Sequence, residues 1–410
     1  MIMSVSHPSQ LLGPGESSAA CRIVIADDDA TIREALRRVL ERAGYEVFAA
    51  ENGAQCLEAI RQHNPQIVIV DWVMPVMDGQ EVCERLRSDS RFDGLYTIMM
   101  SVRADTADKV RALDSGADEY ITKPFQHDEL LARLRSAQRI QSLNRDLTRA
   151  LEQLRADIIA AASVQRNLLP RGPLEYSPLS FAWDFIPAED IAGDMFDVFR
   201  IDEDHIGFYM FDVSGHGVAP AMLSASLHHT ISPGPLDSTI TKIALPQAPF
   251  YRLAEPPEVM DRLNQHFQMS RTGLYFTMFY GLINVRTLHM RYCRSGQAVP
   301  SVMRGAETFD LAAGDVPVGL FPEAKFRGFD FQFQPGDRLL LFSDGVIEAM
   351  NGRGEEFGPE QVKRVVLECG GRNLSATIAK LIADVRSWQG RSLFDDDLSI
   401  LMMEVQANAQ

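Results

Sequence analysis

Four acidic motifs in the second half of the chain carry aspartates that could bind metal ions. They are AGDMFD with Asp194, FDVSGHG with Asp212, FSDGVIEA with Asp344, and FDDDLSIL with Asp395 to Asp397. Each adjoins an apolar run, and a carboxylate where a buried strand emerges is costly unless it is paired or coordinates a metal. Hard oxygen ligands suit Mg²⁺ or Mn²⁺, and two such ions roughly 4 Å apart can activate a bridging water. The motifs therefore predict hydrolysis of a phosphoester without a covalent intermediate.

Other catalytic chemistries leave no comparable signal. The sequence has no GxSxG, GxxxxGK[ST] or HExxH motif, and no Cys and His pair at a convincing spacing. Taken singly, each acidic motif also has a structural interpretation: AGD as a turn, DG as a hairpin and DDD as a solvated loop. Only their combination favours a metal centre.

A second acidic group lies in the first half of the chain. Asp27 and Asp28 follow one apolar run, Asp71 ends another, and Lys123 follows a third in YITKPF. Ligands bind at the carboxyl ends of the strands in open parallel sheets, so these four side chains are expected to converge. Three carboxylates and a lysine form a site for a small hard cation such as Mg²⁺, which would neutralise an incoming phosphoryl group. The alternative is that the acids are surface charges and Lys123 is solvated.

Alternating strands and helices must position this second group. The apolar runs CRIVIA, QIVIVD, YTIMMS and DEYIT are separated by helical stretches such as TIREALRRVLERAG. Near-continuous apolar strands of this kind belong to a parallel sheet covered on both faces. Residues 21–137 are therefore predicted to form an α/β domain, preceded by a flexible tail over residues 1–20. Asp29 and Asp78 are interpreted as turn or helix-cap residues.

One long helix is predicted over residues 126–169, which contain no Pro and no Gly. Apolar residues recur along it in a heptad seam that is clearest over residues 140–161, whereas Arg133 and Gln165 are polar residues at core positions. Asn144 occupies an a position, where this residue type fixes the register of parallel two-stranded coils. We hypothesise a parallel homodimer through this coiled-coil linker; the alternative is a single signalling helix that lies on a neighbouring domain.

A larger α+β domain is predicted over residues 170–410, after the break at Pro170. Its strand-rich segments are LSFAWDFIPA, MFDVFRID, HIGFYMFDVS, YFTMFYGLIN, HMRYCRSG, DRLLLFSDGV and LSILMMEV. A Pro-containing stretch over residues 232–258 is interpreted as an inserted loop, followed by a helix that starts near Pro257. The role of this insertion stays open.

Composition places the chain among ordinary globular proteins. Its 410 residues suggest two to three domains, and hydrophobic and charged residues make up 46% and 23%. The net charge of −16 disfavours nucleic acid and anionic lipid as partners. Without an apolar run of about 18 residues or a leader-like N-terminal pattern, the expected location is cytoplasmic, with no membrane contact. The five cysteines are too widely spaced for a zinc knuckle or a disulfide framework and are expected to be reduced.

The first half resembles the receiver domain of two-component response regulators over essentially all of residues 21–137. The matching segments are IVIADDDATIREALRRVLERAGYEV, VDWVMPVMDG, MMS and GADEYITKPF. The resemblance implies a flavodoxin-like fold with a parallel five-stranded sheet, and Asp71 as the phosphorylated residue. It also implies a Mg²⁺ ion bound by Asp27, Asp28, Asp71 and the Val73 carbonyl.

The same resemblance assigns residues that respond to phosphorylation. Ser101 and Lys123 would bind the phosphoryl group, and Tyr120 would be the aromatic switch. A sensor histidine kinase or a phosphotransfer protein would be the upstream partner.

The second half resembles the metal-dependent 2C-type (PPM) serine/threonine phosphatases over about residues 160–406, in particular the bacterial branch typified by RsbU and SpoIIE. The matching segments are SVQRNLLP, IAGDMFDVF, DVSGHGVAPAML, GLYFTMFYGLIN, FSDGVIEA and DDLSILMMEV. The resemblance implies a β-sandwich flanked by helices and a centre of two Mg²⁺ or Mn²⁺ ions. The implied ligands are the carboxylates of Asp194, Asp212, Asp344 and Asp396 and the carbonyl of Val213.

Within this implied centre, Asp212 would bridge the two ions. The choice of Asp396 over Asp395 or Asp397 depends on aligning DDLS with the family's DD-I-T, so the register could differ by one. His216 is a candidate general acid, with loop stabilisation as the alternative.

The sequence departs from the family pattern at three places. Ala192 stands where Gly is usual before GD, Asn284 stands where Asp is frequent, and residues 295–297 read SGQ where AGH is common. None of these departures removes a proposed metal ligand.

Both resemblances together imply a response regulator whose output is dephosphorylation of phosphoserine or phosphothreonine on a protein, controlled by phosphorylation of Asp71. The implied substrate is an anti-sigma-factor antagonist of the STAS type in a partner-switching pathway. The main alternative is a catalytically inactive, phosphatase-like adaptor that binds a protein partner under receiver control. A transcription factor is disfavoured because no basic recognition helix follows the linker. The sign of control, the kinase, the substrate and the physiological process stay open.

Overall fold

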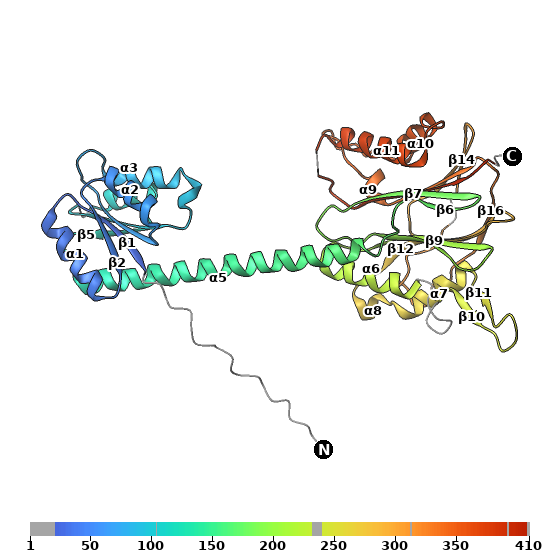
Figure 1. Ribbon diagram of the computed structural model, residues 1–410, viewed down its shortest axis with the longest axis horizontal. Coiled ribbons are helices and arrows are strands. Elements are labelled where there is room, and N and C mark those ends of the chain that lie inside the picture. The colour runs from blue at the N-terminus through green and yellow to red at the C-terminus, as the bar shows by residue number, and fades with distance from the viewer. Residues whose placement is uncertain (1–20, 104, 232–239, 312–313, 392, 408–410) are drawn as a thin grey trace, which may run out of the picture. The chain divides into compact units, whose positions relative to one another are not determined.

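The structure is a computed structural model that describes residues 21–103, 105–231, 240–311, 314–391 and 393–407. The chain divides into two compact units, residues 1–153 and 154–410 (Figure 1). The predicted tail over residues 1–20 and the first part of the predicted insertion, residues 232–239, lie outside the described residues.

A parallel sheet of five strands forms the centre of the first unit, with the strand order β2-β1-β3-β4-β5. The strands are β1 (Arg22–Ala26), β2 (Glu46–Ala50), β3 (Ile67–Asp71), β4 (Tyr96–Ser101) and β5 (Glu119–Thr122). The helices between them are α1 (Ala30–Arg42), α2 (Gly53–His63), α3 (Gly79–Arg87), the short 3-10 helix η1 (Ser90–Phe92) and α4 (Thr106–Asp114). The predicted α/β fold is confirmed.

Alternation along the strands explains how both faces of this sheet are covered. In β1, Ile23 and Ile25 pack with α1 and the long helix α5, whereas Val24 and Ala26 pack with residues of α2 and α3. All four side chains are completely or almost completely buried, as expected for a parallel sheet between two helical layers. Asp29 and Asp78 cap α1 and α3 by accepting hydrogen bonds from backbone N–H groups, which confirms their interpretation as cap residues.

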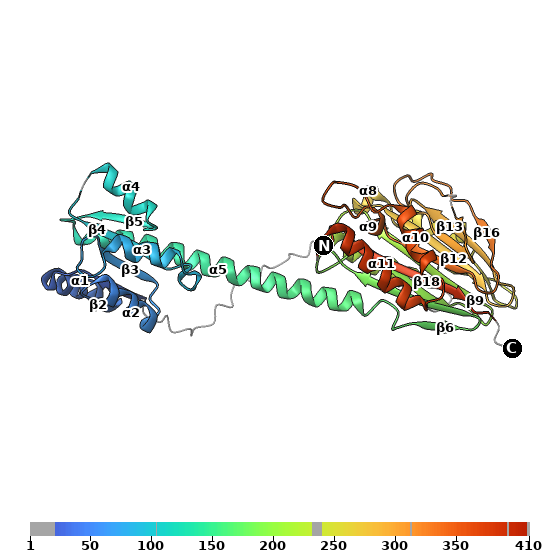
Figure 2. The ribbon, with the colours of Figure 1, turned by 90° about the horizontal axis from the view of Figure 1, so that it is seen from above.

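The long helix α5 (His127–Arg166) leaves the first unit and enters the second as one continuous helix (Figure 2). Its first turns belong to the core of the first unit, where Leu130 and Ala137 are buried. The first end of the predicted heptad seam therefore packs within the first unit, and its last end packs within the second unit. Arg133, a polar residue of this seam, pairs with Glu119 and Glu129. Five apolar residues in the middle of the helix remain 44–59% exposed: Ile140, Leu143, Leu147, Leu151 and Leu154.

Two antiparallel sheets form the second unit. The five-stranded sheet has the order β16-β13-β12-β9-β8, and its strands are β8 (Met195–Arg200), β9 (His205–Val213), β12 (Phe276–Asn284), β13 (His289–Ser295) and β16 (Phe329–Gln332). The six-stranded sheet has the order β15-β14-β17-β18-β7-β6, and its strands are β6 (Leu174–Tyr176), β7 (Leu179–Ile186), β14 (Ser301–Arg304), β15 (Glu307–Asp310), β17 (Arg338–Phe342) and β18 (Leu398–Val405).

Helices cover the outer face of each sheet. Figure 1 shows α10 (Pro359–Glu368) and α11 (Leu374–Gln389) beside the sheet that contains β7, and α6 (Val218–Ile231) and α7 (Pro256–His266) on the opposite side of the unit. Two short helices, α8 (Met269–Thr272) and α9 (Asp344–Ile347), complete the unit. The predicted sandwich flanked by helices is confirmed.

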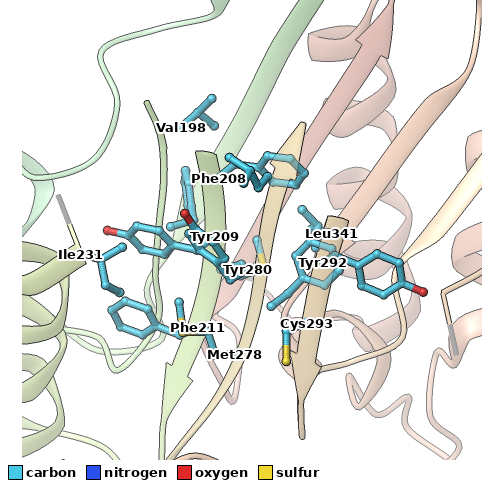
Figure 3. Packing of buried hydrophobic residues seen from close by; sticks show 14 of the residues in the cluster. Val198, Phe208, Tyr209, Phe211, Ile231, Met278, Tyr280, Tyr292, Cys293 and Leu341 are labelled. Carbon is cyan, nitrogen blue, oxygen red and sulfur yellow. The ribbon is translucent and has the colours of Figure 1, made fainter. Parts of the chain in front are cut away.

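Aromatic side chains fill the space around the five-stranded sheet. Phe208 of β9 contacts Phe181 of β7 across the two sheets, with ring centroids 5.9 Å apart. Tyr209 and Phe211 stack on each other at 5.5 Å and face Ile231 of α6 in Figure 3, on the other side of the strand. The strand β9 is thus buried on both faces, which holds Asp212 at its end in a fixed position.

The described part of the predicted insertion contains a β-hairpin. The strands β10 (Lys242–Ala244) and β11 (Tyr251–Leu253) pair with each other, so the interpretation of residues 232–258 as a loop was wrong for this part. Among the described residues, no helix combines the length and apolar character needed to cross a bilayer. All five cysteines are free, as expected.

Two candidate carboxylate sites

The first candidate site lies at the carboxyl ends of β1 and β3. Asp27, Asp28 and Asp71 each offer a carboxylate oxygen, and these oxygens all lie within 4.8 Å of one another. A single divalent cation with oxygen ligands can bridge such a group. Lys123, just after β5, donates hydrogen bonds to Asp27 Oδ2 at 2.6 Å and to Asp71 Oδ1 at 2.8 Å. The structure therefore brings the four predicted side chains together.

Burial and charge act against each other at Asp71. Burial raises the pKa of the Asp71 carboxyl, Lys123 opposes this rise, and the charges of Asp27 and Asp28 add to it. Burial alone would lower the pKa of Lys123, but its hydrogen bonds to Asp27 and Asp71 outweigh burial and hold that pKa above its ordinary value. The lysine is thus kept charged among the carboxylates. Gly79 makes room for the turn after β3, because a Cβ there would lie 2.3 Å from the Asp71 carbonyl oxygen.

The other predicted residues of the first unit lie just after β3, at the end of β4 and in β5. Ser101 is buried at the end of β4, and its Oγ accepts a hydrogen bond from the Arg103 N–H. Tyr120 donates its hydroxyl hydrogen to the Arg103 carbonyl. The Val73 side chain is exposed. Sequence reasoning missed Trp72, which stacks edge-on against Tyr120 with ring centroids 6.1 Å apart and lies 5.4 Å from the Arg103 guanidinium.

The second candidate site gathers the predicted carboxylates of the second unit. Asp194 directly precedes β8, Asp212 lies in β9, Asp344 begins α9 after β17, and Asp396 precedes β18. Burial raises the pKa of Asp212 to about 8, with further contributions from the charges of Asp344 and Asp396. Burial also raises the pKa of Asp194, and Asp212, Asp397 and Asp344 add to this rise. The carboxylates therefore share one electrostatic environment, although they come from four distant segments.

These carboxylates are more widely spread than those of the first site. In the part of the chain that the structure describes, Asp27, Asp28 and Asp71 form the single group of three or more acidic, His or Cys residues whose ligand atoms all lie within 4.8 Å. A centre for two ions has to distribute its ligands over a larger volume than a site for one ion. None of the five carboxylates of Asp194, Asp212, Asp344, Asp396 and Asp397 makes an ion pair with a described Lys, Arg or His residue.

Asp194 carries the strongest indication that this site suits a cation. Its side chain is almost completely buried, and Oδ2 accepts a hydrogen bond of 2.6 Å from Ser399 Oγ. Its Oδ1 is buried without any hydrogen-bond partner. A buried carboxylate oxygen without a partner is costly, and a bound divalent cation would remove this cost. The donor set, which consists of oxygens alone, fits Mg²⁺ or Mn²⁺.

Hydrogen bonds distinguish the three consecutive aspartates before β18. Asp397 accepts from the Ala188 N–H through Oδ1 and from the Gly193 N–H through Oδ2, so both of its oxygens hold the loop before Asp194. Asp395 is exposed and pairs with Arg391. Asp396 accepts only from the neighbouring backbone N–H of Asp397 among its described contacts, which leaves it available as a ligand. The choice of Asp396 as the metal ligand stays a prediction.

Two glycines allow close backbone approach at the second site. A Cβ on Gly193 would lie 2.7 Å from the Val213 carbonyl oxygen and 3.3 Å from Asp212 Oδ1. A Cβ on Gly345 would lie 2.3 Å from the Asp397 carbonyl oxygen. Because neither position has room for a side chain, the AGD and SDG motifs can place their aspartates next to the other two segments.

His216 and His228 make their described contacts with groups other than the predicted metal ligands. The His216 side chain is 88% exposed, and its Nδ1 lies 3.4 Å from Glu189 Oε1. His228 packs on the other side of β9, where its Nδ1 shares a hydrogen bond of 2.7 Å with the Tyr209 hydroxyl. Sequence reasoning missed Ser399 and the holding role of Asp397, because both act through contacts between segments about 200 residues apart.

Each half of the chain matches a known protein family. Residues 202–406 match the family described as Stage II sporulation protein E, and residues 23–135 match the response regulator receiver domain. Response regulator MprA from Mycobacterium sp. (strain KMS) is 44% identical over 115 residues, which are 28% of this chain and 49% of MprA. The chain spans about half the length of the curated relatives it matches.

Two solved structures are similar to parts of this chain. The SiaA-PP2C domain of Pseudomonas aeruginosa is 18% identical, has a TM-score of 0.50, and covers 62% of this chain and 98% of its own. At this identity the likeness concerns the fold alone. A response regulator from Chloroflexus aurantiacus J-10-fl is 34% identical, has a TM-score of 0.28, and covers 29% of this chain and 98% of its own.

Proposed function

The chain belongs to the Stage II sporulation protein E family and carries a response regulator receiver domain, and from this premise we propose that it is a response regulator whose output is a metal-dependent protein phosphatase. The observation that carries the proposal is the buried Asp194, whose Oδ1 has no partner and whose neighbours are other carboxylates. A surface that only binds a partner protein would gain nothing from such an arrangement.

In the proposed centre, Asp194, Asp212, Asp344 and Asp396 hold two Mg²⁺ or Mn²⁺ ions together with the Val213 carbonyl. Bound ions of this kind activate a water molecule and neutralise the phosphoryl oxygens of the substrate. Ser399 and Asp397 keep the ligands in place: Ser399 orients Asp194, and Asp397 holds the backbone of Gly193.

In the proposed receiver, Asp71 accepts the phosphoryl group from a sensor histidine kinase or a phosphotransfer protein in the cytoplasm. Asp27 and Asp28 bind Mg²⁺, and Lys123 pairs with a phosphoryl oxygen once Asp71 is modified. Ser101 also binds the phosphoryl group, and Tyr120, held by the Arg103 carbonyl, responds to it.

We further propose that the chain forms a homodimer through α5. Four of the five exposed apolar residues, Ile140, Leu147, Leu151 and Leu154, occupy a and d positions of the predicted heptad seam. A coiled coil would bury this stripe and would give receiver phosphorylation a route to the phosphatase unit.

The proposed substrate is a phosphoserine- or phosphothreonine-containing protein of the STAS type. The test is Mn²⁺-dependent release of phosphate from a serine-phosphorylated STAS-domain protein by the full chain. We expect turnover that is lost in Asp212→Asn and retained in Asp395→Asn, the exposed neighbour of the site. A folded chain that binds Mn²⁺ but releases no phosphate from any phosphoprotein would overturn the phosphatase and favour the adaptor.

A further inference from the structure

Gln165, near the end of α5, is buried and makes two hydrogen bonds to a single backbone residue. Its side chain is 6% exposed. Its Nε2 donates to the Ala192 carbonyl at 2.7 Å, and its Oε1 accepts from the Ala192 N–H at 3.1 Å. A primary amide can donate to the carbonyl and accept from the N–H of one residue, as a neighbouring β-strand does. This pair of hydrogen bonds fixes the position and the orientation of that residue.

The residue that Gln165 holds lies next to the second carboxylate site. Ala192 is almost completely buried and precedes Gly193 and Asp194. The same loop is held from the opposite direction by Asp397, which accepts the N–H groups of Ala188 and Gly193. The backbone that leads into Asp194 is therefore fixed between one side chain of α5 and one side chain from the start of β18.

Apolar contacts bind the end of α5 to this loop and to α6. Ala162 of α5 packs with Ile191 of the loop and Ala221 of α6, and Ile158 extends the cluster by one turn. A rotation of α5 by one residue position is about 100°, which would move the Gln165 amide away from Ala192. The two hydrogen bonds therefore form only for one register of α5 on the second unit.

We propose that Gln165 is a positioning residue for Asp194, and that its two hydrogen bonds to Ala192 raise the affinity of the second unit for divalent cations. This inference rests on the proposed metal centre. Loss of the two hydrogen bonds frees the Ala192 backbone and lets Asp194 turn away from the other carboxylates. Outer partners that orient a metal ligand typically change metal affinity by about 10- to 100-fold.

The test compares Gln165→Met, which keeps the length of the side chain and removes both hydrogen bonds, with Ser163→Met, which introduces the same side chain at an exposed position two residues earlier. Calorimetric titration of Mn²⁺ into each full chain is the primary readout. We expect Gln165→Met to bind Mn²⁺ about tenfold more weakly at the second unit. Ser163→Met is expected to match the wild type.

A second measurement distinguishes a positioning role of Gln165 from a general loss of structure in the variant. For Gln165→Met, the Mn²⁺ concentration for half-maximal phosphatase activity should rise by the same factor, whereas kcat at saturating Mn²⁺ and KM for the phosphoprotein should return to wild-type values. Wild-type Mn²⁺ affinity in folded Gln165→Met would overturn the inference. So would a fall in kcat that saturating Mn²⁺ does not restore.

If circular dichroism shows that Gln165→Met does not fold, Gln165→Glu takes its place. This variant keeps the acceptor for the Ala192 N–H but sets a carboxylate against the Ala192 carbonyl, so its Mn²⁺ affinity should also fall. Unchanged affinity in folded Gln165→Glu would contradict the inference. A wild type that binds Mn²⁺ but hydrolyses no phosphoprotein would defeat the proposed activity alone, because the effect of Gln165 on Mn²⁺ binding would still be measured.

Discussion

The two carboxylate sites differ in how the negative charge of their clustered aspartates is balanced. In the first unit, Lys123 lies 2.6 Å from Asp27 and 2.8 Å from Asp71, so a fixed cation balances part of the negative charge. In the second unit, Asp194 and Asp212 have no described cationic partner, and burial raises their pKa values. A site with its own cation can stay assembled while a phosphoryl group arrives and leaves. A site of carboxylates alone can balance its charge only by protonation or by bound cations.

The largest expected effect comes from a variant that disables the first site and leaves the second site unchanged. Asp71→Asn should abolish incorporation of a phosphoryl group from a small acyl phosphate, because an amide cannot accept it. The basal Mn²⁺-dependent phosphatase rate should stay within about twofold, because Asp71 shares no described partner with the carboxylates of the second site. Phosphate-affinity electrophoresis and phosphate release measure the two quantities.

The matched control for this prediction is Asp78→Asn, whose carboxylate only caps α3. Incorporation that persists in Asp71→Asn would show that another residue is the acceptor.

The second prediction disturbs the second site and leaves the first intact. Gly193→Ala places a Cβ 2.7 Å from the Val213 carbonyl oxygen, so the loop must shift away from Asp212. Mn²⁺ affinity of the second unit should fall by about 10- to 100-fold. Phosphorylation of the receiver should be unchanged. Gly371→Ala is the control, because a Cβ there meets no atom within 4 Å; equal Mn²⁺ affinity in the two variants would contradict the geometry.

The smallest expected effect concerns Asp197, a partly buried carboxylate outside both sites. Burial raises its pKa to about 6 from an ordinary value of 3.8, and its Oδ2 lies 4.0 Å from His228 Nδ1. Because the folded chain binds this proton more tightly than the unfolded chain, the stabilisation is complete below about pH 4 and is lost as the pH rises through about 6. At neutral pH, Asp197→Asn should therefore stabilise the second unit, by at most roughly 3 kcal/mol.

Thermal unfolding between pH 4 and pH 8 checks this prediction. The wild type should lose more stability than Asp197→Asn over this range, and the two curves should converge at the acidic end. Parallel curves would mean that the pKa of Asp197 is the same in the folded and the unfolded chain, which would contradict the prediction.

The sequence predicts the architecture of both units because its signals are local. Near-continuous apolar runs such as residues 67–70 mark buried parallel strands, and an aspartate at the end of a run, such as Asp71, marks the edge where a site can form. The same reasoning places Asp212 and Asp344 at the ends of buried strands in the second unit.

The contacts that hold these aspartates in place could not be read from the sequence. Ser399 and Asp397 belong to the last strand region yet act on Asp194 and Gly193, about 200 residues earlier. Gln165 was interpreted as an imperfection of a heptad seam, whereas the structure pairs it with Ala192. A polar residue at an apolar position marks an exception to the local pattern, but only the tertiary fold shows its partner.

The most direct test of the contrast between the two sites counts the bound metal ions. Mn²⁺ is titrated calorimetrically into the wild-type chain, into Asp27→Asn, and into Asp212→Asn. We predict three ions per wild-type chain, two of them retained in Asp27→Asn and the ion of the first unit retained in Asp212→Asn. A wild-type chain that binds one ion, lost in Asp27→Asn and unaffected by Asp212→Asn, would contradict a metal centre in the second unit.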